Sequence, residues 1–140
     1  MIVVRLFIGL TIYFFIAGAI SCDKKKDRYF SESAYKMILE RMPRAKDKEL
    51  TIYYMDGDCS FCIAKAIAIE KDLKDTKNVL AIFVAVTNNP ATIEYYFKKS
   101  NIQDLLISSR DSILKNSNVL FNEVVMIQKN RKMSTIHKYD

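Results

Sequence analysis

The spacing of apolar residues along the chain predicts three amphipathic helices. In each of them apolar side chains recur every three or four residues, which places them on one helical face. The first helix lies between residues 29 and 42, and Pro43 ends it because the residue before a proline is pushed out of helical geometry. The second runs to about Lys74, and the third begins at Asn89 and Pro90, an N-cap side chain followed by proline. The predicted inner faces are Tyr35, Ile38, Leu39 and Met42 in the first helix, Cys62, Ala66, Ile69 and Leu73 in the second, and Ile93, Tyr96 and Phe97 in the third.

Two apolar segments between these helices predict buried strands. Residues 50–55 (LTIYYM) are rich in β-branched and aromatic side chains and hold too few polar ones for an edge strand. Residues 78–86 (NVLAIFVAV) form an almost unbroken apolar run, which is typical of a parallel strand covered on both faces. Four tyrosines lie on these strands and helices, and we expect them to pack in the core. They are Tyr53, Tyr54, Tyr95 and Tyr96.

The last third of the chain predicts a short strand and a closing hairpin. Residues 102–107 form the short strand, and Ser108 with Asp111 resembles a capping motif for a short helix. Residues 123–128 (EVVMIQ) and 133–138 (MSTIHK) flank a polar turn and predict an antiparallel hairpin. The succession of strand, helix, strand, helix and hairpin predicts an α/β sandwich with a mixed sheet.

The first twenty residues differ in composition from the rest and predict an export signal. From Leu6 to Ile20 the chain is an uncharged apolar run of about 15 residues, shorter than the roughly 20 that a membrane-spanning helix needs. Residues 19–22 (AISC) resemble the bacterial lipoprotein box, in which a signal peptidase cuts before a cysteine that carries lipid. The resemblance implies a signal peptide over residues 1–21 and a lipid on Cys22. The alternative is an uncleaved N-terminal anchor.

Length and composition fit one exported domain behind a charged tether. The chain has 140 residues, of which 50% are hydrophobic and 27% charged, so it is long enough for one core and too apolar for a disordered chain. Residues 22–28 are the expected lipidated tether, whose lysines lie near lipid headgroups, and residues 29–140 the expected folded domain. The net charge of +6 is spread along the chain, so we assign it to envelope chemistry and expect no nucleic-acid partner. Either form of attachment places the domain on the periplasmic or outer side of a bacterial cell-envelope membrane.

Cys59 and Cys62 are the candidate reactive groups of this domain. With Cys22 lipidated they are its only thiols, and an exported pair meets oxidants. On a helix, a spacing of three residues brings two Cβ atoms within roughly 5 to 6 Å, so a reversible disulfide is sterically available. Cys59 lies at the helix N-terminus, where free N–H groups and the helix dipole favour an anion, and its thiolate is therefore the better nucleophile. Cys62, one turn further along the buried stripe, is the predicted resolving thiol.

A cysteine pair at a strand-to-helix turn resembles the active site of the thioredoxin-like superfamily, and within it the bacterial membrane-tethered redoxins that act as thiol–disulfide oxidoreductases. The resemblance covers residues 49–139 and rests on DCSFC (58–62), the helix after it, the second strand and the hairpin around residues 128–130. It implies a thioredoxin-like sandwich with a mixed central sheet flanked by helices and a closing C-terminal β-hairpin. In a departure from the superfamily, its C-terminal helix is expected to be missing. The resemblance also implies that Cys59 attacks a disulfide-containing protein substrate, that Cys62 releases it, and that a membrane reductase or oxidant resets the pair. No cofactor is expected.

Three positions depart from the superfamily's pattern. In the superfamily a cis-proline faces the cysteines. The corresponding place in this chain is near Asn122 and Glu123 and holds no proline, so peptide-substrate docking must differ or be absent. Asp58 replaces the tryptophan before the first cysteine. Tyr53 replaces a buried acid in the preceding strand, which leaves no aligned proton acceptor.

The acidic residues beside the first cysteine affect the expected redox behaviour. Asp56 and Asp58 are expected to raise the pKa of Cys59 and to oppose the helix dipole. A raised pKa stabilises the disulfide relative to the thiolate, so we predict a reducing couple. The predicted function is that of an envelope thiol–disulfide oxidoreductase.

Two other functions are compatible with the same residues. Cys-x-x-Cys is half of a zinc ligand set, but the chain has no second pair, and the sole histidine, His137, falls near the end of a hairpin strand, so no metal is assigned. Two thiolates also suit a soft monovalent metal such as copper, with Met55 nearby. The stronger alternative is a non-catalytic thioredoxin-like lipoprotein that binds a partner and keeps Cys59 and Cys62 as a structural disulfide.

Overall fold

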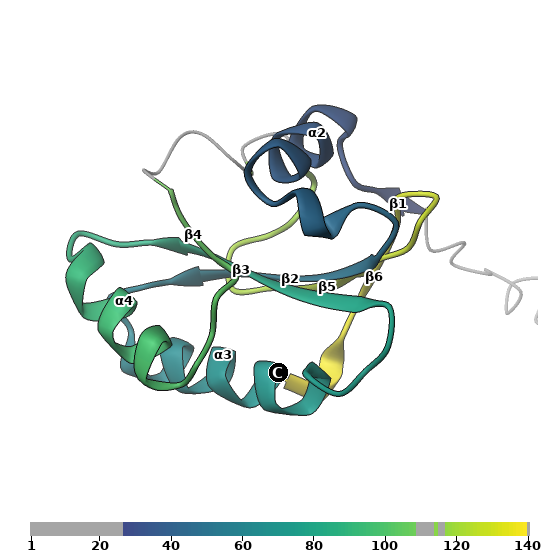
Figure 1. The fold of residues 1–140 in the computed structure, drawn as a ribbon. Helices are drawn as coiled ribbons and strands as arrows, with labels where there is room; N and C mark the ends of the chain where they lie inside the picture. Colours follow the sequence, from purple (N-terminus) through teal and green to yellow (C-terminus); the bar gives the residue numbers. More distant parts are fainter. Residues whose placement is uncertain (1–26, 109–113, 115–116, 140) are drawn as a thin grey trace, which may run out of the picture.

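The computed structural model describes residues 27–108, 114 and 117–139 (Figure 1). The predicted signal peptide, Cys22 and the predicted capping residue Asp111 lie outside these residues. None of the helices it describes has both the length and the apolar character needed to cross a membrane. The elements are β1 (Arg28–Tyr29), α2 (Glu32–Arg41), the 3₁₀ turn η1 (Pro43–Ala45), β2 (Glu49–Asp56), α3 (Ser60–Leu73), β3 (Val79–Val86), α4 (Pro90–Lys99), β4 (Leu105–Ser108), β5 (Val124–Ile127), β6 (Lys132–Thr135) and the 3₁₀ turn η2 (His137–Tyr139).

The strands of the described chain form one mixed sheet in the order β1-β6-β5-β2-β3-β4. β2 pairs in parallel with β3, and β3 in parallel with β4. On the other side of β2 the strands β5, β6 and β1 add antiparallel pairs, so β5 and β6 form the predicted closing hairpin. The central strands β2 and β3 are the two that were predicted to be buried. The predicted α/β sandwich with a mixed sheet is therefore confirmed, and after β6 the described residues hold only the short turn η2.

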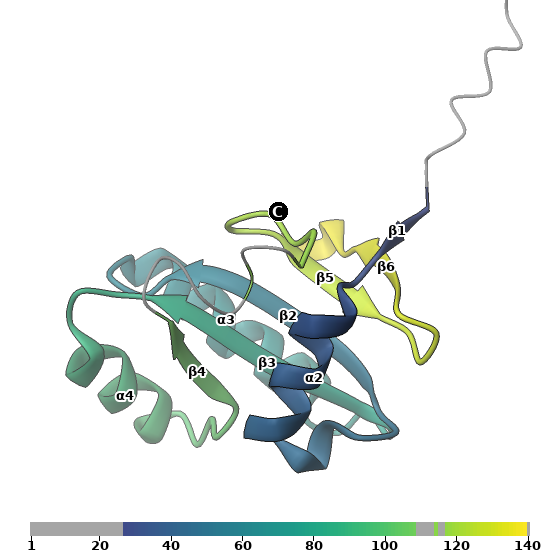
Figure 2. The same cartoon turned by 90° about the horizontal axis from the view of Figure 1, so that it is seen from above.

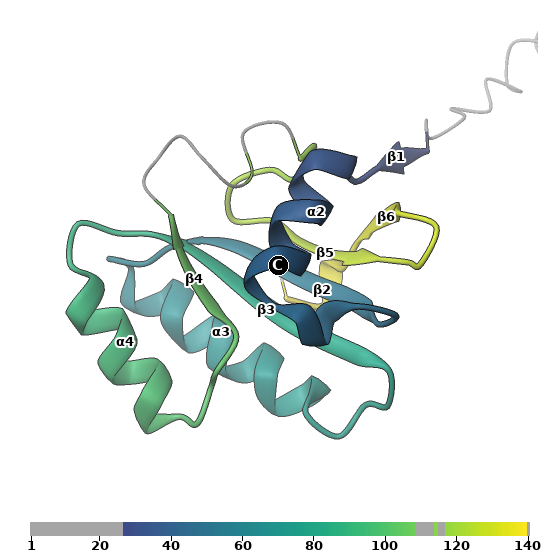
Figure 3. The same ribbon diagram turned by 45° about the horizontal axis from the view of Figure 1, so that its top comes forward.

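Helices cover both faces of this sheet. α3 and α4 lie side by side against one face, and α2 covers the other (Figures 1 and 3). In the view from above, α2 crosses in front of the sheet and α3 lies behind it (Figure 2). Each face has its own apolar cluster, and β2 supplies both, with Leu50 and Ile52 toward α2 and Tyr53 and Met55 toward α3. Because β2 is packed from both sides, its C-terminal end holds the turn that follows in a defined place.

The helices lie where the sequence predicted them, but one residue of the predicted inner faces, Tyr96, is wrong. In α4, Ile93 and Phe97 are buried, whereas Tyr96 is 44% exposed and Tyr95 is 60% exposed. The buried Phe97 ring of α4 stacks edge to face on Phe83 of β3. The two exposed tyrosines stack edge to face on each other, with ring centroids 5.5 Å apart. The expectation of core packing is thus wrong for this pair and correct for Tyr53, which is 1% exposed.

One edge of the sheet holds a strand that no periodicity predicted. Arg28, the last residue of the expected tether, pairs with Met133 of β6, and Tyr29 pairs with Lys132. The Arg28 guanidinium also lies 2.6 Å from a carboxylate oxygen of Glu123, which is 95 positions away in the sequence. The start of the domain is therefore tied to the loop that precedes β5.

Candidate redox site

A tight turn after β2 places the two cysteines at the C-terminal end of the central strand. The turn needs Gly57, because a Cβ there would lie 2.9 Å from the Cβ of Thr87. The Gly57 N–H donates to the Val86 carbonyl at 2.8 Å. Asp58 holds the turn as well, since its carboxylate accepts hydrogen bonds from the Thr87 hydroxyl and, at 2.9 Å, from the Asn88 N–H. The start of α3 is thus fixed against the end of β3.

The structure brings Cys59 and Cys62 together at the opening turn of α3. Cys59 is the N-cap residue, and its sulfur accepts a hydrogen bond from the Cys62 backbone N–H at 3.2 Å. Cys59 is half-buried, whereas Cys62 is only 6% exposed and packs in the α3 cluster with Ala66 and Ile69. One thiol of the pair is therefore open to another molecule, and the other lies beneath it.

The surroundings of Cys59 lower the pKa of its thiol. The largest cause is a hydrogen bond from the Cys62 side chain, and the backbone N–H groups of Cys62 and Phe61 act in the same direction. Partial burial and the Asp56 carboxylate oppose these bonds and are outweighed. The prediction is correct for Asp56, whose charge raises this pKa, but the predicted net rise is wrong because the hydrogen bonds outweigh that charge. The Asp58 carboxylate is instead engaged by the loop after β3.

Cys62 has a different environment from Cys59. Burial raises the pKa of the Cys62 thiol, and the hydrogen bond with Cys59 raises it further. Two polar side chains reach its sulfur: the Asn122 carbonyl oxygen Oδ1 accepts from the thiol at 4.0 Å, and a hydrogen bond with the Tyr53 hydroxyl lowers the pKa. At neutral pH Cys62 is therefore a neutral thiol with an acceptor on one side and a donor on the other.

The sequence analysis predicted no role for Tyr53 or Asn122, although both positions depart from the superfamily's pattern. Tyr53 occupies the place of the superfamily's buried acid, and the alternation along β2 already placed it on the face that α3 covers. Asn122 lies where the cis-proline was expected. Its φ of 64° is a left-handed conformation that asparagine adopts more readily than most residues. Its N–H donates to the Tyr54 carbonyl at 2.7 Å, which joins this loop to β2 beside the cysteines.

Comparison with known proteins identifies the architecture. No family model and no curated protein matches the sequence. A secreted disulfide oxidoreductase from Mycobacterium tuberculosis, homologous to E. coli DsbE, superposes with a TM-score of 0.57 at 15% identity, over 69% of this chain and 73% of that one. The chain has a thioredoxin-like fold. The thioredoxin domain of a thiol–disulfide oxidoreductase from Bacteroides vulgatus superposes with a TM-score of 0.54 at 12% identity, over 67% and 72% of the two chains. DsbF from M. tuberculosis gives 0.53 at 12% identity, over 64% and 69%.

The thioredoxin-like domain exposes large apolar side chains in two places: between its cysteines and in the loop before β5. Phe61, between the two cysteines, is 76% exposed. Leu120 and Phe121 are 65% and 50% exposed, and they directly precede Asn122, which reaches the Cys62 sulfur. We call Phe61, Leu120 and Phe121 the apolar rim. Exposed apolar side chains that gather in one patch are typical of surfaces that bind another molecule.

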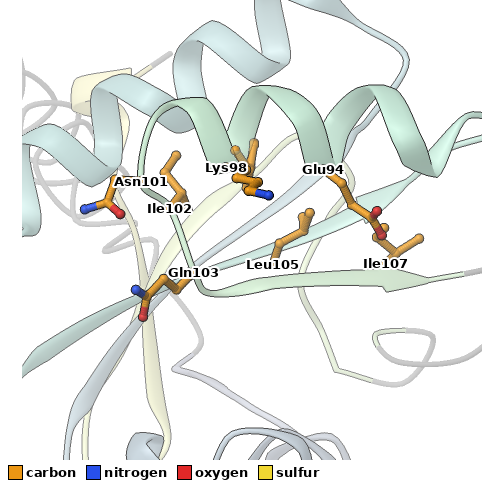
Figure 4. A pocket seen from close by; sticks show the side chains of 8 residues that line it. Glu94, Lys98, Asn101, Ile102, Gln103, Leu105 and Ile107 are labelled. Atoms are coloured by element: carbon orange, nitrogen blue, oxygen red, sulfur yellow. The ribbon is translucent and has the colours of Figure 1, made fainter.

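A cavity of about 430 Å³ lies elsewhere in the thioredoxin-like fold, between α4 and β4. Figure 4 shows Glu94 and Lys98 of α4 over Leu105 and Ile107 of β4. No cysteine lines this cavity, so it is not part of the redox site.

The residues considered for metal binding occupy ordinary structural positions. Met55 is fully buried and packs in the α3 cluster as an apolar side chain, and His137 lies in the turn η2. Over residues 27–108, 114 and 117–139, no three or more His, Cys, Asp or Glu side chains gather closely enough to hold a metal ion.

Proposed function

We propose that this chain is a thiol–disulfide oxidoreductase of the bacterial cell envelope, with Cys59 as nucleophile and Cys62 as resolving thiol. The contrast between the two thiols carries the proposal. Cys59 is half-buried at a helix N-terminus and has a lowered pKa, while Cys62 is buried and has a raised one. The oxidoreductases that share the fold support the same reaction class.

The exchange consists of two displacements. The Cys59 thiolate attacks one sulfur of a substrate disulfide, which forms a mixed disulfide and releases the other substrate sulfur as a thiolate that takes up a proton from water. Cys62 then loses its proton to solvent and attacks the Cys59 sulfur. A Cys59–Cys62 disulfide forms, the second substrate sulfur leaves, and the substrate has gained two electrons. A membrane reductase returns the pair to the dithiol, and an oxidant would run the same steps in reverse.

The apolar rim supports a disulfide-containing protein as substrate. A disulfide flanked by apolar residues would reach Cys59 while a neighbouring side chain contacts Phe61, which is 76% exposed. The Phe121 ring is held by an edge-to-face contact with Tyr54, with centroids 5.0 Å apart, so this part of the rim is presented by β2 itself.

The reduction potential of the Cys59–Cys62 pair determines the direction of electron flow. The predicted reducing couple relied on a raised Cys59 pKa, and the lowered pKa removes that support. A stabilised thiolate favours the dithiol and therefore a more oxidising couple.

Anchoring through Cys22 remains part of the proposal. The residues 19–22 support it, with a signal peptide over residues 1–21 and a tether over 22–28 that leaves the domain facing the periplasm or exterior. Expression in bacteria with labelled palmitate tests it. The wild-type chain is expected to carry the label and the Cys22→Ala variant to lack it.

The test of the enzymatic proposal is insulin-disulfide reduction by the full-length chain in detergent. We expect turnover by the wild type and by Ser60→Ala, which changes an exposed residue of the same helical turn. Cys59→Ser is expected to fall to the uncatalysed rate because it lacks the nucleophile. Equal turnover by Cys59→Ser and the wild type would overturn the proposal and favour the non-catalytic binding lipoprotein.

A further inference from the structure

Tyr53 is a polar side chain buried in the same cluster as Cys62, and the two displacements of the exchange do not involve it. It lies on the α3 face of β2, is 1% exposed, and shares the apolar cluster of Cys62. Its ring lies under α3, because Nζ of Lys65, three residues after Cys62, is 5.2 Å from the ring centroid. On its other side Tyr53 pairs with Val124 of β5, two residues after Asn122. The ring is thus enclosed by the same two segments that enclose the Cys62 sulfur.

A hydroxyl in such a place needs a polar partner, because burying it without one costs free energy. The Cys62 sulfur packs in the same buried cluster, and a hydrogen-bonding interaction between the two groups raises the pKa of Tyr53 and lowers that of Cys62. Asn122 contacts that sulfur as well, but through a carbonyl oxygen, which can only accept. Among the described residues the side-chain donor to Cys62 on the β2 side is therefore Tyr53.

We propose that the Tyr53 hydroxyl donates a hydrogen bond to the Cys62 sulfur when that sulfur becomes a thiolate, and that it speeds the resolving step in this way. The inference rests on the proposed function, since the resolving step is what requires a Cys62 thiolate. The two neighbours then serve opposite protonation states: Asn122 accepts from the thiol, and Tyr53 donates to the thiolate. Without a donor, a thiolate at this buried place would be strongly disfavoured.

Tyr53 acts in this step as a donor and not as a base. Burial raises its pKa, and the neighbouring sulfurs raise it further, so the hydroxyl keeps its proton throughout. The Cys62 proton goes to solvent, and the Cys62 thiolate then attacks the Cys59 sulfur of the mixed disulfide. The bond from Cys59 to the substrate sulfur breaks, and the departing thiolate takes up a proton from water.

The other charged and titratable groups around this pair come from three segments. Cys59 and Asp56 both raise the pKa of Cys62, and Lys65 lies over the tyrosine ring. From the loop before β5, the Glu123 carboxylate is engaged by Arg28 and Thr135. None of these groups is changed by a substitution at Tyr53 that only removes its oxygen.

The first test measures the titration of Cys62 directly. The full-length chain in detergent carries Cys59→Ala, and iodoacetamide labelling of Cys62 is followed against pH by mass spectrometry of the peptide that contains it. Tyr53→Phe, which keeps the ring, is expected to move the titration midpoint up by about one pH unit, the equivalent of about a tenfold loss of thiolate at neutral pH. Tyr54→Phe is the matched control, because its ring lies on the other face of β2. An unshifted midpoint in Tyr53→Phe, or an equal shift in both variants, would overturn the role of Tyr53.

The second test measures the resolving step in the chain with both cysteines. The reduced protein is mixed with oxidised glutathione and quenched with acid, and the mixed disulfide at Cys59 is followed over time. We expect Tyr53→Phe to form the mixed disulfide at the wild-type rate and to release it about tenfold more slowly at neutral pH, with the difference vanishing in alkali. A slowdown independent of pH would indicate a packing defect and would overturn the inference. If the wild type itself forms no mixed disulfide, the proposed function is overturned, whereas a midpoint unchanged in the first test overturns Tyr53 alone.

Discussion

The contact between Arg28 and Glu123 allows a quantitative prediction about stability. Burial raises the pKa of Glu123, but hydrogen bonds from Arg28, from the Thr135 hydroxyl and from the Leu120 N–H outweigh it and lower the pKa from 4.5 to about 2. Glu123→Gln keeps the shape of the side chain and removes its charge. It should therefore weaken the link between β1 and the loop before β5.

The size of the effect follows from the two pKa values. The difference between a pKa of 4.5 and one of about 2 corresponds to about 3 kcal/mol if all of it contributes to the free energy of unfolding. Arg28 is 37% exposed, so solvent screens the pair, and we expect a loss of about 1 to 2 kcal/mol in the free energy of unfolding at pH 7. In a domain of this size that is a fall in Tm of roughly 4 to 16 °C.

The pH dependence of this loss separates charge from packing. The folded pKa lies below the unfolded one, so the carboxylate stabilises the fold above pH 4.5, and this stability is lost as the pH falls toward 2. Urea unfolding followed by circular dichroism should thus show wild type and Glu123→Gln far apart at pH 7 and converging near pH 2. Glu32→Gln is the control, because Glu32 also forms ion pairs but is 63% exposed, and it should change stability by less than about 0.5 kcal/mol. A difference that stays constant across this range would refute the electrostatic account.

Three further predictions concern the site itself. Asp56→Asn should lower the Cys59 pKa further, because it removes a charge that raises it, and alkylation of Cys59 should move to lower pH; a shift to higher pH would contradict the assignment. Gly57→Ala should destabilise the domain by about 1 to 3 kcal/mol in thermal unfolding, since the new Cβ meets Thr87 at 2.9 Å, and an unchanged Tm would show that the turn relaxes freely. Phe61→Ser should slow the reduction of insulin and leave that of oxidised glutathione unchanged; equal effects on both would remove the apolar rim from substrate binding.

The local pattern of apolar residues was sufficient to predict the strands and helices whose side chains have the same surroundings along the whole element. β2 and β3 are covered on both faces, which produces uninterrupted apolar runs, and the stripe of α3 repeats because one side of the helix meets the sheet throughout. The position of Cys59 and Cys62 followed from the same local pattern, since a turn between a buried strand and an amphipathic helix leaves them at the helix start.

The features that sequence reasoning missed depend on residues far apart in the chain. β1 has two residues, too few for any periodicity, and it forms where Arg28 meets Met133 and Glu123. The predicted sign of the Cys59 pKa shift was wrong for a different reason. Hydrogen bonds from Cys62 and Phe61 outweigh the Asp56 charge, and their strength depends on the geometry of the folded turn. Contacts of these kinds form only in the complete fold and leave no periodic pattern in the sequence.

The two-residue strand β1 would have a mechanical consequence under the proposed anchoring at the N-terminus. Tension on the anchor would act on residue 27 and peel β1 from β6 one pair at a time, starting with Arg28. The same force would act on the Arg28 guanidinium, which donates hydrogen bonds to the Glu123 carboxylate and the Asn118 carbonyl. These contacts join β1 to the loop that carries Asn122, so under the proposed N-terminal anchoring a pull on the chain would be passed to the edge of the cysteine pair.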